Sequence, residues 1–376
     1  MKKAGQGKKV LVAMSGGVDS CVAAVLLLEQ GYEVVGCFMR LGSDDSVERD
    51  DVCIEPGPDT GKAHRQGCCS VNDAGDARLV AAILDIPLYV MNFKRDFNRI
   101  IDYFVDEYND GRTPNPCIRC NSWLKFGKLA AYAQSINADH IATGHYARLQ
   151  RSGSGRSHLL RGSDLNKDQS YVLFDTSRDM LERMLLPVGE YEKPQIRRIA
   201  ERCSLPVFDK PDSQEICFVP DNDYFGLVKR RTPDQVTPGP IVDRDGRVLG
   251  QHDGHQHFTI GQRRGLSVSL GHPIYVTEKD AQTNTVVVGA KQQVVADGLA
   301  ANGTNWLIDP PTRTPMRCRV QIRSGSRSVP ATVQVMGPDA LEVQFEQPQA
   351  AVSPGQAVVC YDGDELVGGG WIDHAI

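Results

Sequence analysis

The chain has 376 residues, of which 41% are hydrophobic and 24% are charged, values that are ordinary for a soluble globular protein. At this length we expect two or three domains rather than a single core. The formal net charge of −5 excludes nucleic-acid binding through an overall positive charge, so an RNA ligand would require basic residues gathered in one place.

The expected compartment is the cytoplasm. No apolar run approaches the length of a membrane span, and the basic residues 1–9 lead into a strand pattern without the apolar region of a signal peptide. We therefore expect no membrane partner. In the cytoplasm the eleven cysteines indicate thiol chemistry or metal binding rather than structural disulfides.

The first predicted strand, 10–14, and the first predicted helix, 22–28, flank the motif Ser-Gly-Gly-Val-Asp-Ser at residues 15–20. Gly16 and Gly17 permit backbone torsions that side chains block, and they let amide groups approach a ligand. The helix start adds unpaired N–H donors and the positive end of a dipole. The motif therefore predicts a phosphate-binding loop. It is not a Walker A loop, because no Lys-Ser or Lys-Thr pair follows the glycines. An ordinary turn with N-capping serines is the alternative.

Strands and helices alternate to about residue 145. A second strand is predicted at 33–39, and a strand–helix–strand opening is typical of a parallel sheet. The polar stretch 42–66 is predicted to be a long loop. The other predicted elements are helices at 73–84, 97–108, 125–134 and 193–202 and strands at 87–92 and 140–143.

Two further features close predicted strands. Met39 ends the second strand, and Gly144-His145-Tyr146 follows the strand at 140–143. Because doubly wound sheets bind ligands at the carboxyl ends of their strands, we expect both features on the same edge as the phosphate loop. Met39 could offer backbone contacts to a base, although packing in the core is the favoured explanation on sequence alone.

A C-x₂-C pair, Cys117 and Cys120, lies in the stretch 111–121. Two prolines in this stretch are expected to prevent a regular helix, so the pair is predicted to lie on a loop. Such a pair is moderate evidence for redox chemistry, zinc or an iron–sulfur cluster. The nearest basic residues are Arg112, Arg119 and Lys125. Cationic neighbours lower a thiol pKa and favour the thiolate.

Other candidate ligands lie apart from this pair. Cys217 follows the polar segment 212–215, a setting comparable to that of the C-x₂-C pair. Cys68 and Cys69 are as well explained by a buried pair as by a functional role. His252, His255 and His257 cluster in one hairpin-like stretch. A surface turn is favoured there over a metal site, because neither a cysteine nor a clear fourth ligand is near.

The composition changes after about residue 218, where short alternating runs are separated by Gly-, Pro- and Asn-rich turns. This pattern predicts a small β-rich domain followed by a terminal barrel. The predicted strands include 274–277, 285–288, 317–322 and 331–335. The predicted domains are 1–217, 218–297 and 298–376.

The second half also contains a basic stretch. Between residues 310 and 338 there are five arginines and no acidic residue: Arg313, Arg317, Arg319, Arg323 and Arg327. On a strand, Arg317, Arg319 and Arg323 would project from one face and could bind phosphates. A solvated strand face is the alternative reading.

Several motifs occur in one order along nearly the whole chain. They are Ser-Gly-Gly-Val-Asp-Ser at 15–20, Gly-Arg-Thr-Pro-Asn-Pro at 111–116, Ala-Thr-Gly-His-Tyr at 142–146, Lys-Asp-Gln-Ser-Tyr at 167–171, Ile-Cys-Phe at 216–218, Gly-Gln-Arg-Arg-Gly-Leu at 261–266 and Pro-Gly-Gln at 354–356. In these motifs the chain resembles the bacterial tRNA-specific 2-thiouridylases, a family of PP-loop ATP pyrophosphatases. The resemblance implies an α/β domain with a Rossmann-like parallel sheet that carries the PP-loop, then a small β-rich central domain and a C-terminal β-barrel that binds tRNA.

The resemblance also implies a reaction. ATP, with Mg²⁺, adenylates the C2 oxygen of the wobble uridine of tRNA, pyrophosphate leaves, and sulfur then displaces AMP. The implied ATP contacts are Ala13, Met14, Ser15, Gly16, Gly17, Val18, Asp19, Ser20, Met39 and Gly144. The implied contacts to the target base are Asn115, Pro116 and Cys117. The implied contacts to the rest of the tRNA are His145, Lys167, Asp168, Gln169, Arg323, Ser324 and Gln356.

For the sulfur, the resemblance implies a persulfide on Cys217 and an attacking thiol at Cys120, which leaves a disulfide between the two. The implied partner is a sulfur donor such as a cysteine desulfurase or a persulfide relay protein. Cys117 stands where many members carry an aspartate that acts as a general acid or base. Three thiolates, Cys117, Cys120 and Cys217, could instead hold a [4Fe–4S] cluster with one open iron.

Two other functions compete with this one. A PP-loop ligase that adenylates a small substrate would not need the three cysteines or the basic stretch. A non-catalytic RNA-binding or iron–sulfur protein would not need a pyrophosphate-binding loop.

Overall fold

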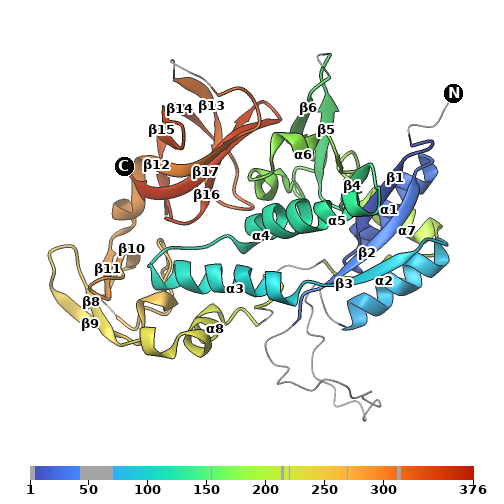
Figure 1. Ribbon diagram of the computed structural model, residues 1–376. Coiled ribbons are helices and arrows are strands. Elements are labelled where there is room, and N and C mark those ends of the chain that lie inside the picture. The colour runs from blue at the N-terminus through green and yellow to red at the C-terminus, as the bar shows by residue number, and fades with distance from the viewer. Residues whose placement is uncertain are drawn as a thin grey trace, which may run out of the picture.

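The computed structural model describes residues 5–42, 71–153, 155–212, 216–219, 221–268, 270–310 and 315–376. Figure 1 shows a parallel sheet with its helices at one end, a β-barrel at the other, and two long helical segments that run between them. The domain order expected from the sequence, α/β and then β-rich and then barrel, is confirmed.

The first sheet has five parallel strands in the order β3-β2-β1-β4-β7. The strands are β1 (Lys9–Ala13), β2 (Glu33–Arg40), β3 (Leu88–Asn92), β4 (His140–Ala142) and β7 (Met184–Leu185). The helices of this part are α1 (Val18–Glu29), α2 (Val71–Ile83), α3 (Lys94–Asn109), α5 (Ala130–Ser135), α6 (Arg178–Leu181) and α7 (Lys193–Arg202). The chain builds outward from β1 on one side and then returns to place β4 on its other side. In doubly wound sheets such a reversal, here at the carboxyl ends of β1 and β4, is the usual place for a ligand.

The segment that carries the C-x₂-C pair is helical, so the prediction of a loop there was wrong. Helix α4 (Pro116–Arg119) continues into a π-helix, η1 (Cys120–Leu129), and the two form what we call the cysteine helix. Proline is tolerated in a first helical turn, where its missing N–H has no partner to lose, and Pro116 occupies that place. Asn115 caps the helix by accepting a hydrogen bond from the Ile118 amide at 3.4 Å.

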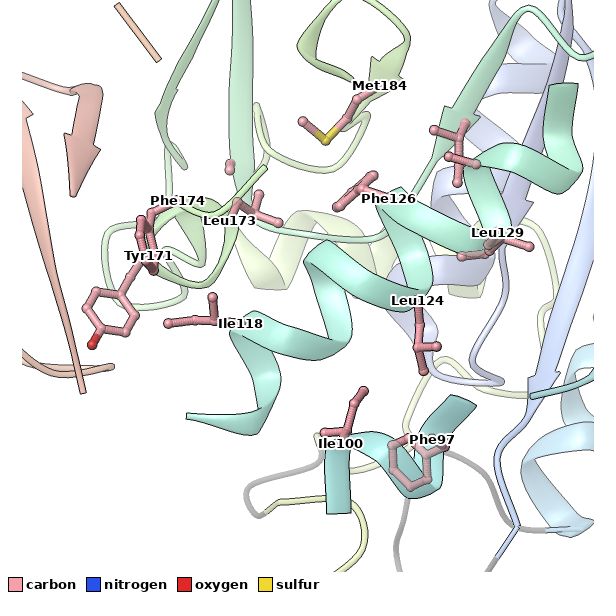
Figure 2. Close-up of a cluster of buried hydrophobic side chains, with 14 of the residues drawn as sticks. Phe97, Ile100, Ile118, Leu124, Phe126, Leu129, Tyr171, Leu173, Phe174 and Met184 are labelled. Carbon is pink, nitrogen blue, oxygen red and sulfur yellow. The ribbon is translucent and has the colours of Figure 1, made fainter. Parts of the chain in front are cut away.

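The cysteine helix lies on the main hydrophobic core. Figure 2 shows Ile118 projecting from it toward Tyr171 and Leu124 toward Ile100 of α3, while Leu129 lies at the end of the same helix. These three residues are at most 2% exposed. Side chains this completely buried fix the position of their helix, since truncating one typically costs about 2–5 kcal/mol. The cysteines are thus carried by a firmly packed element.

Beyond residue 219 the structure has two antiparallel or mixed sheets and one helix that the sequence analysis missed, α8 (Tyr224–Arg231). The small sheet has the order β10-β11-β8-β9, with β8 (Gly239–Val242), β9 (Val248–His252), β10 (Tyr275–Asp280) and β11 (Thr285–Gly289). The 3₁₀ helices are η2 (Ser170–Leu173), η3 (Pro233–Gln235), η4 (His255–His257) and η5 (Lys291–Val294). Helix α8 was missed because it has only eight residues, too few for a clear helical period.

Six antiparallel strands form the barrel in the order β12-β15-β14-β13-β16-β17, and β12 closes it by pairing with β17. They are β12 (Val295–Trp306), β13 (Met316–Gln321), β14 (Val329–Gly337), β15 (Ala340–Ala350), β16 (Ala357–Asp362) and β17 (Glu365–Ala375). A hairpin from the first part of the chain, β5 (Ala147–Arg151) and β6 (Ser157–Arg161), joins this sheet where Leu160 pairs with Glu365.

The histidine cluster was predicted to be a surface turn, and this was wrong for two of its members. His252 and His255 are 5% and 4% exposed. His255 contacts the Asn109 carbonyl oxygen and the Asn284 side-chain oxygen at 3.0 Å each. The histidine therefore ties the small sheet to the end of α3. Within the described ranges no helix has both the length and the apolar composition needed to cross a membrane.

Lys279 on β10 gives a prediction about stability. Its Nζ is buried without a hydrogen-bond partner in the described part of the chain, 5.8 Å from the Tyr108 ring, and burial lowers the pKa of Lys279 to about 7. Below pH 7 the ammonium is charged in both the folded and the unfolded state, so its burial lowers the free energy of unfolding by the full amount. As the pH rises from about 7 toward 10.5, the folded state holds the neutral amine and this loss of stability is gradually removed. We expect Lys279→Met to raise the free energy of unfolding at pH 6–7 by about 1–3 kcal/mol and to flatten its rise above pH 7, as measured by urea unfolding. Lys291→Met, at an exposed position, is the control.

Candidate functional site

The phosphate loop, residues 15–20, joins the carboxyl end of β1 to the start of α1. Gly16 has φ +74°, and a Cβ there would lie 2.2 Å from the Asp73 carbonyl oxygen, so only glycine fits. The two serines close the loop on itself. The Ser15 amide donates to the Ser20 Oγ at 3.1 Å, and that hydroxyl donates to the Gly17 carbonyl oxygen at 3.1 Å. Ser15 is exposed and Ser20 is buried, so the loop presents its first residue to solvent.

Gly144 lies against this loop, as expected from the sheet order. A Cβ on Gly144 would meet the Ser20 amide nitrogen at 2.6 Å and the Asp19 carbonyl carbon at 2.7 Å. The end of β4 therefore touches the first turn of α1, with no room for a side chain between them. Met39 lies near the end of β2 and is partly buried against the main core. Its contact with ATP stays a prediction.

Two lysines reach the loop from far along the chain, and the sequence analysis missed both. Lys193, at the start of α7, donates to the two carboxylate oxygens of Asp19 at 2.8 and 2.9 Å. Lys210 donates to the Gly16 carbonyl oxygen at 3.0 Å. The loop sequence lacks the lysine of a Walker motif, but the fold brings cations to the same place. No local pattern could have revealed them, because they lie 174 and 194 residues from their partners.

Asp19 is held from two sides. Besides Lys193, the Tyr146 hydroxyl donates to Asp19 at 2.7 Å. Burial and then the Asp19 charge raise the pKa of Tyr146, so the phenol keeps its proton and remains a donor. Asp212 completes the cluster by accepting from Lys193 and Lys167 at 2.7 Å each. Burial alone would raise the pKa of Asp212, but these hydrogen bonds outweigh it and lower the pKa below its ordinary value.

His145 is 7% exposed and contacts two side chains, with Thr143 Oγ1 2.7 Å from its Nδ1 and Lys125 Nζ 3.4 Å from its Nε2. Burial, and secondarily the Lys125 charge, place the pKa of His145 well below its ordinary value. The imidazole is therefore neutral at pH 7 and does not offer a cation to RNA. Contact with tRNA stays a prediction for His145.

The motif Lys167-Asp168-Gln169 makes internal contacts in this structure. The Asp168 carboxylate accepts from Arg161 at 2.7 Å and from the Gly162 amide at 3.0 Å. Gln169 accepts from the Tyr146 amide through its side chain at 3.0 Å. The motif therefore fastens the segment after β4 beside the phosphate loop. Contact of this motif with tRNA stays a prediction.

The predicted base contacts sit at the start of the cysteine helix. Asn115 is 8% exposed and caps that helix, whereas Cys117 is exposed and Cys120 is partly buried. Cys217 belongs to the described segment 216–219, and the neighbouring Phe218 ring packs edge-on against Phe97 at 5.6 Å. Cys120 and Cys217 both pack on the main hydrophobic core. The fold thus brings two thiols that are distant in sequence to the same core.

The three cysteines do not form a ready cluster site. Among the residues with described positions, no group of three or more His, Cys, Asp or Glu side chains is arranged to hold a metal ion. As placed, Cys117, Cys120 and Cys217 therefore do not fit a three-thiolate ligand set. Cys68 and Cys69 lie outside the described residues.

Gln356 lies at the interface between the barrel and the cysteine helix. It is 9% exposed, and its side-chain amide donates to the carbonyl oxygens of Thr113 and Pro114 at 3.0 and 2.9 Å. The Thr113 amide donates to the Pro354 carbonyl oxygen at 2.7 Å. Gly355, with φ +87°, leaves no room for a Cβ, which would lie 2.9 Å from the Thr113 carbonyl oxygen. The barrel therefore clamps the chain just before the cysteines.

This clamp gives a prediction. We expect Gln356→Ala to slow the sulfur transfer that the resemblance assigns to Cys120 and Cys217 about tenfold or more, because two buried carbonyls lose their donor at a cost of about 1–3 kcal/mol and the cysteine helix loses its anchor. Pyrophosphate release should change little, because none of the hydrogen bonds described above joins the phosphate loop to this clamp. Gln349→Ala, on the outer barrel, is the matched control. An equal loss of sulfur transfer and of pyrophosphate release would contradict a positioning role for Gln356.

The basic stretch is exposed but only partly on a strand. Arg317 and Arg319 are exposed on the same face of β13, as predicted. Arg323 and Ser324 follow the end of that strand, so the prediction that Arg323 shares its face was wrong. The Arg323 guanidinium donates to the Ala350 carbonyl oxygen at 3.3 Å, which fixes it beside β15. Arg313 lies outside the described residues.

Three family profiles cover almost the whole chain. A profile of the tRNA methyl transferase HUP domain matches residues 8–221, one of the tRNA methyl transferase PRC-barrel domain matches 226–290, and one of the aminomethyltransferase beta-barrel domain matches 276–372. These profiles follow the parallel sheet, the small sheet and the barrel in order.

Curated relatives match over nearly their full lengths. The tRNA-specific 2-thiouridylase MnmA of Carboxydothermus hydrogenoformans is 49% identical over 98% of both chains. The tRNA-specific 2-thiouridylase MnmA of Symbiobacterium thermophilum is 46% identical over 98% of this chain and 93% of its own. Among solved structures, NMN synthetase from Francisella tularensis is 16% identical with a TM-score of 0.33, covering 61% of this chain and 78% of its own.

Proposed function

Since this chain belongs to the tRNA-specific 2-thiouridylase family and is therefore a tRNA sulfurtransferase, we propose that it replaces the C2 oxygen of the wobble uridine with sulfur at the expense of ATP. The phosphate loop is the observation that supports this most. Its own serines close it, and it lies at the edge of the sheet where the strand order reverses between β1 and β4. ATP use, tRNA binding and thiol chemistry then belong to one site and its surroundings.

In the first step the uracil C2 oxygen attacks the α-phosphorus of ATP. The bond from that phosphorus to the bridging oxygen breaks, and pyrophosphate leaves with Mg²⁺. The amides of residues 15–20 and the positive end of α1 would stabilise the negative charge that develops on the pyrophosphate. Asp19, fixed by Lys193 and Tyr146, keeps the first turn of α1 in place. The adenylated oxygen is now a far better leaving group than before.

In the second step the terminal sulfur of a Cys217 persulfide attacks C2, and AMP departs with the old oxygen. The Cys120 thiolate then attacks the Cys217 sulfur and releases the thiouridine. Two thiols are oxidised to a disulfide, and the transferred sulfur gains the two electrons. A sulfur donor, such as a cysteine desulfurase or a persulfide relay protein, must restore the persulfide after the disulfide is reduced.

The persulfide route is favoured over a [4Fe–4S] cluster because Cys117, Cys120 and Cys217 are not arranged as a ligand set among the described residues. Cys117→Asp separates the routes. Under the persulfide route we expect the variant, purified anaerobically, to keep sulfur incorporation within about fivefold, with no iron in either protein. Loss of both iron and activity would establish the cluster instead. Iron quantitation with UV-visible and EPR spectra is the measurement.

One assay tests the function itself. Pyrophosphate release from ATP is measured with and without unmodified tRNA, together with sulfur incorporation into the RNA. We expect release to depend on tRNA and thiolated uridine to accumulate. Release that ignores tRNA would instead support a ligase for a small substrate. No turnover under reducing, anaerobic conditions would support a binding protein.

Substrate tRNA would bind to the β-rich part of the chain. Arg317, Arg319 and Arg323 are exposed there and suit the phosphate backbone. The division into 1–217 for catalysis, 218–297 as a central domain and 298–376 as the tRNA-binding barrel is part of this proposal.

A further inference from the structure

We propose that Lys210 supplies the cation that contacts the pyrophosphate of ATP at the phosphate loop, the role that a Walker lysine has within its own loop. The inference rests on the proposed use of ATP but not on the identity of the acceptor substrate. It begins from the position of the Lys210 ammonium, which donates to the Gly16 carbonyl oxygen at 3.0 Å. Gly16 is the residue where the loop turns.

The present partners of Lys210 lie on α2. Its Nζ also donates to Asp73 and Asp76, at 2.7 and 2.5 Å. Burial alone would lower the pKa of Lys210, but these two carboxylates outweigh it and raise the pKa, so the side chain is a cation at any physiological pH. A permanent positive charge therefore stands at the loop before any nucleotide arrives.

Lys193 is a poorer candidate for the same contact. Its side chain is only 9% exposed, and its Nζ is surrounded by Asp19 and Asp212 oxygens at 2.7–2.9 Å. The Lys210 side chain is 27% exposed. Lys193 thus orients Asp19 from behind, while Lys210 is the loop cation that an incoming anion can reach.

The charges around the loop favour a contact between Lys210 and a phosphate oxygen. The ion pairs around the loop join four basic and four acidic side chains: Lys167, Lys193, Arg197 and Lys210, with Asp19, Asp73, Asp76 and Asp212. The Asp164 carboxylate, which accepts from the Lys193 amide at 3.1 Å, lies beside them. A polyphosphate adds negative charge to this group. The three N–H donors of Lys210 reach Asp73, Asp76 and the Gly16 carbonyl oxygen. Moving the third donor from this neutral carbonyl to a phosphate oxygen gains a charge-assisted hydrogen bond and keeps both α2 carboxylates paired.

A purely structural role is the competing explanation, in which Lys210 only ties α2 to the loop. The two roles differ in what the ligand must contain. A structural tie would support adenosine and pyrophosphate alike, because both need an ordered loop. A phosphate contact would matter only for ligands that carry phosphate.

The test uses the full chain and two probes, Mg²⁺–pyrophosphate and adenosine, with dissociation constants from calorimetry. For Lys210→Met we expect about 10- to 100-fold weaker binding of pyrophosphate and a shallower salt dependence, with adenosine affinity unchanged. Lys210→Arg should restore pyrophosphate binding to within a few-fold of the parent protein. Arg202→Met is the matched control, since Arg202 at the end of α7 pairs with Glu29 at the end of α1, away from the loop.

The outcomes are distinct. Pyrophosphate affinity that is unchanged in Lys210→Met would overturn the inference, as would an equal loss of pyrophosphate and adenosine binding, which would establish the structural tie. Because neither probe involves tRNA or sulfur, the result is independent of whether the protein thiolates the wobble uridine.

Discussion

Replacement of either Cys120 or Cys217 by serine is expected to abolish sulfur incorporation into tRNA, by a factor of at least about 10³, while tRNA-dependent pyrophosphate release continues. A serine hydroxyl can neither carry a persulfide nor act as a thiolate. Both cysteines pack on the main core, whereas Val18 of the phosphate loop packs in the second hydrophobic core, so adenylation should not need the thiols. The measurement compares thiouridine formed with pyrophosphate released in the same reaction.

Cys203→Ser is the matched control, because Cys203 is also partly buried but ends α7, in the second hydrophobic core. It should leave both steps intact. Normal thiouridine formation by Cys217→Ser would contradict the persulfide route. Loss of pyrophosphate release in either variant would show that the thiols take part in the first step.

Asp19→Asn is expected to have the opposite signature, with pyrophosphate release lost by about 10²-fold or more and thiolation lost with it. The amide keeps the shape of the side chain but removes the charge that faces Lys193, which is buried at 9% exposure. Breaking a buried ion pair from one side costs about 3–5 kcal/mol, and the Asp212 carboxylate, which still pairs with Lys193, lowers that cost here. The Tyr146 hydroxyl can still donate to the side-chain oxygen of the amide. The expected loss of pyrophosphate release therefore follows from the removed charge and not from a change of shape.

Glu29→Gln tests whether any charge change on α1 has this effect. Glu29 ends the same helix and pairs with Arg202 at the surface, where both side chains are more than half exposed. Such pairs contribute about 0–1 kcal/mol. We expect unaltered pyrophosphate release in this control. Release by Asp19→Asn at the parent rate would refute the role of Asp19 in holding the loop.

The phosphate loop could be predicted because its information is local. A buried strand, two glycines and a helix start lie within twenty residues, and the structure has all three where the pattern put them. Gly144 could be placed beside the loop because parallel sheets bring their carboxyl ends to one edge. The three-part architecture likewise followed from the change in strand and helix periods along the chain.

The cysteine helix and the loop lysines could not be predicted, for two different reasons. At Pro116 a local signal existed, since Asn followed by Pro is a common helix start, but two prolines close together also favour a loop. For Lys193 and Lys210 no local signal exists, because only tertiary packing brings α7 and the following turn to residues 16–19. Gln356 shows the same limit: the motif was visible, but its partners, Thr113 and Pro114, lie more than 240 residues away.

The hairpin of β5 and β6 determines where the chain can be cut. It leaves the first part of the chain and pairs with β17, the last strand of the barrel. A fragment that ends near residue 297 would therefore keep the hairpin but lose its neighbour, and β6 would become an open edge able to pair with other chains. A fragment that begins there would keep β17 paired with β12 and β16 and would lose only its pairing with β6 at Glu365. Expression of the full chain, rather than of its separate parts, is thus the way to obtain a protein that resists aggregation.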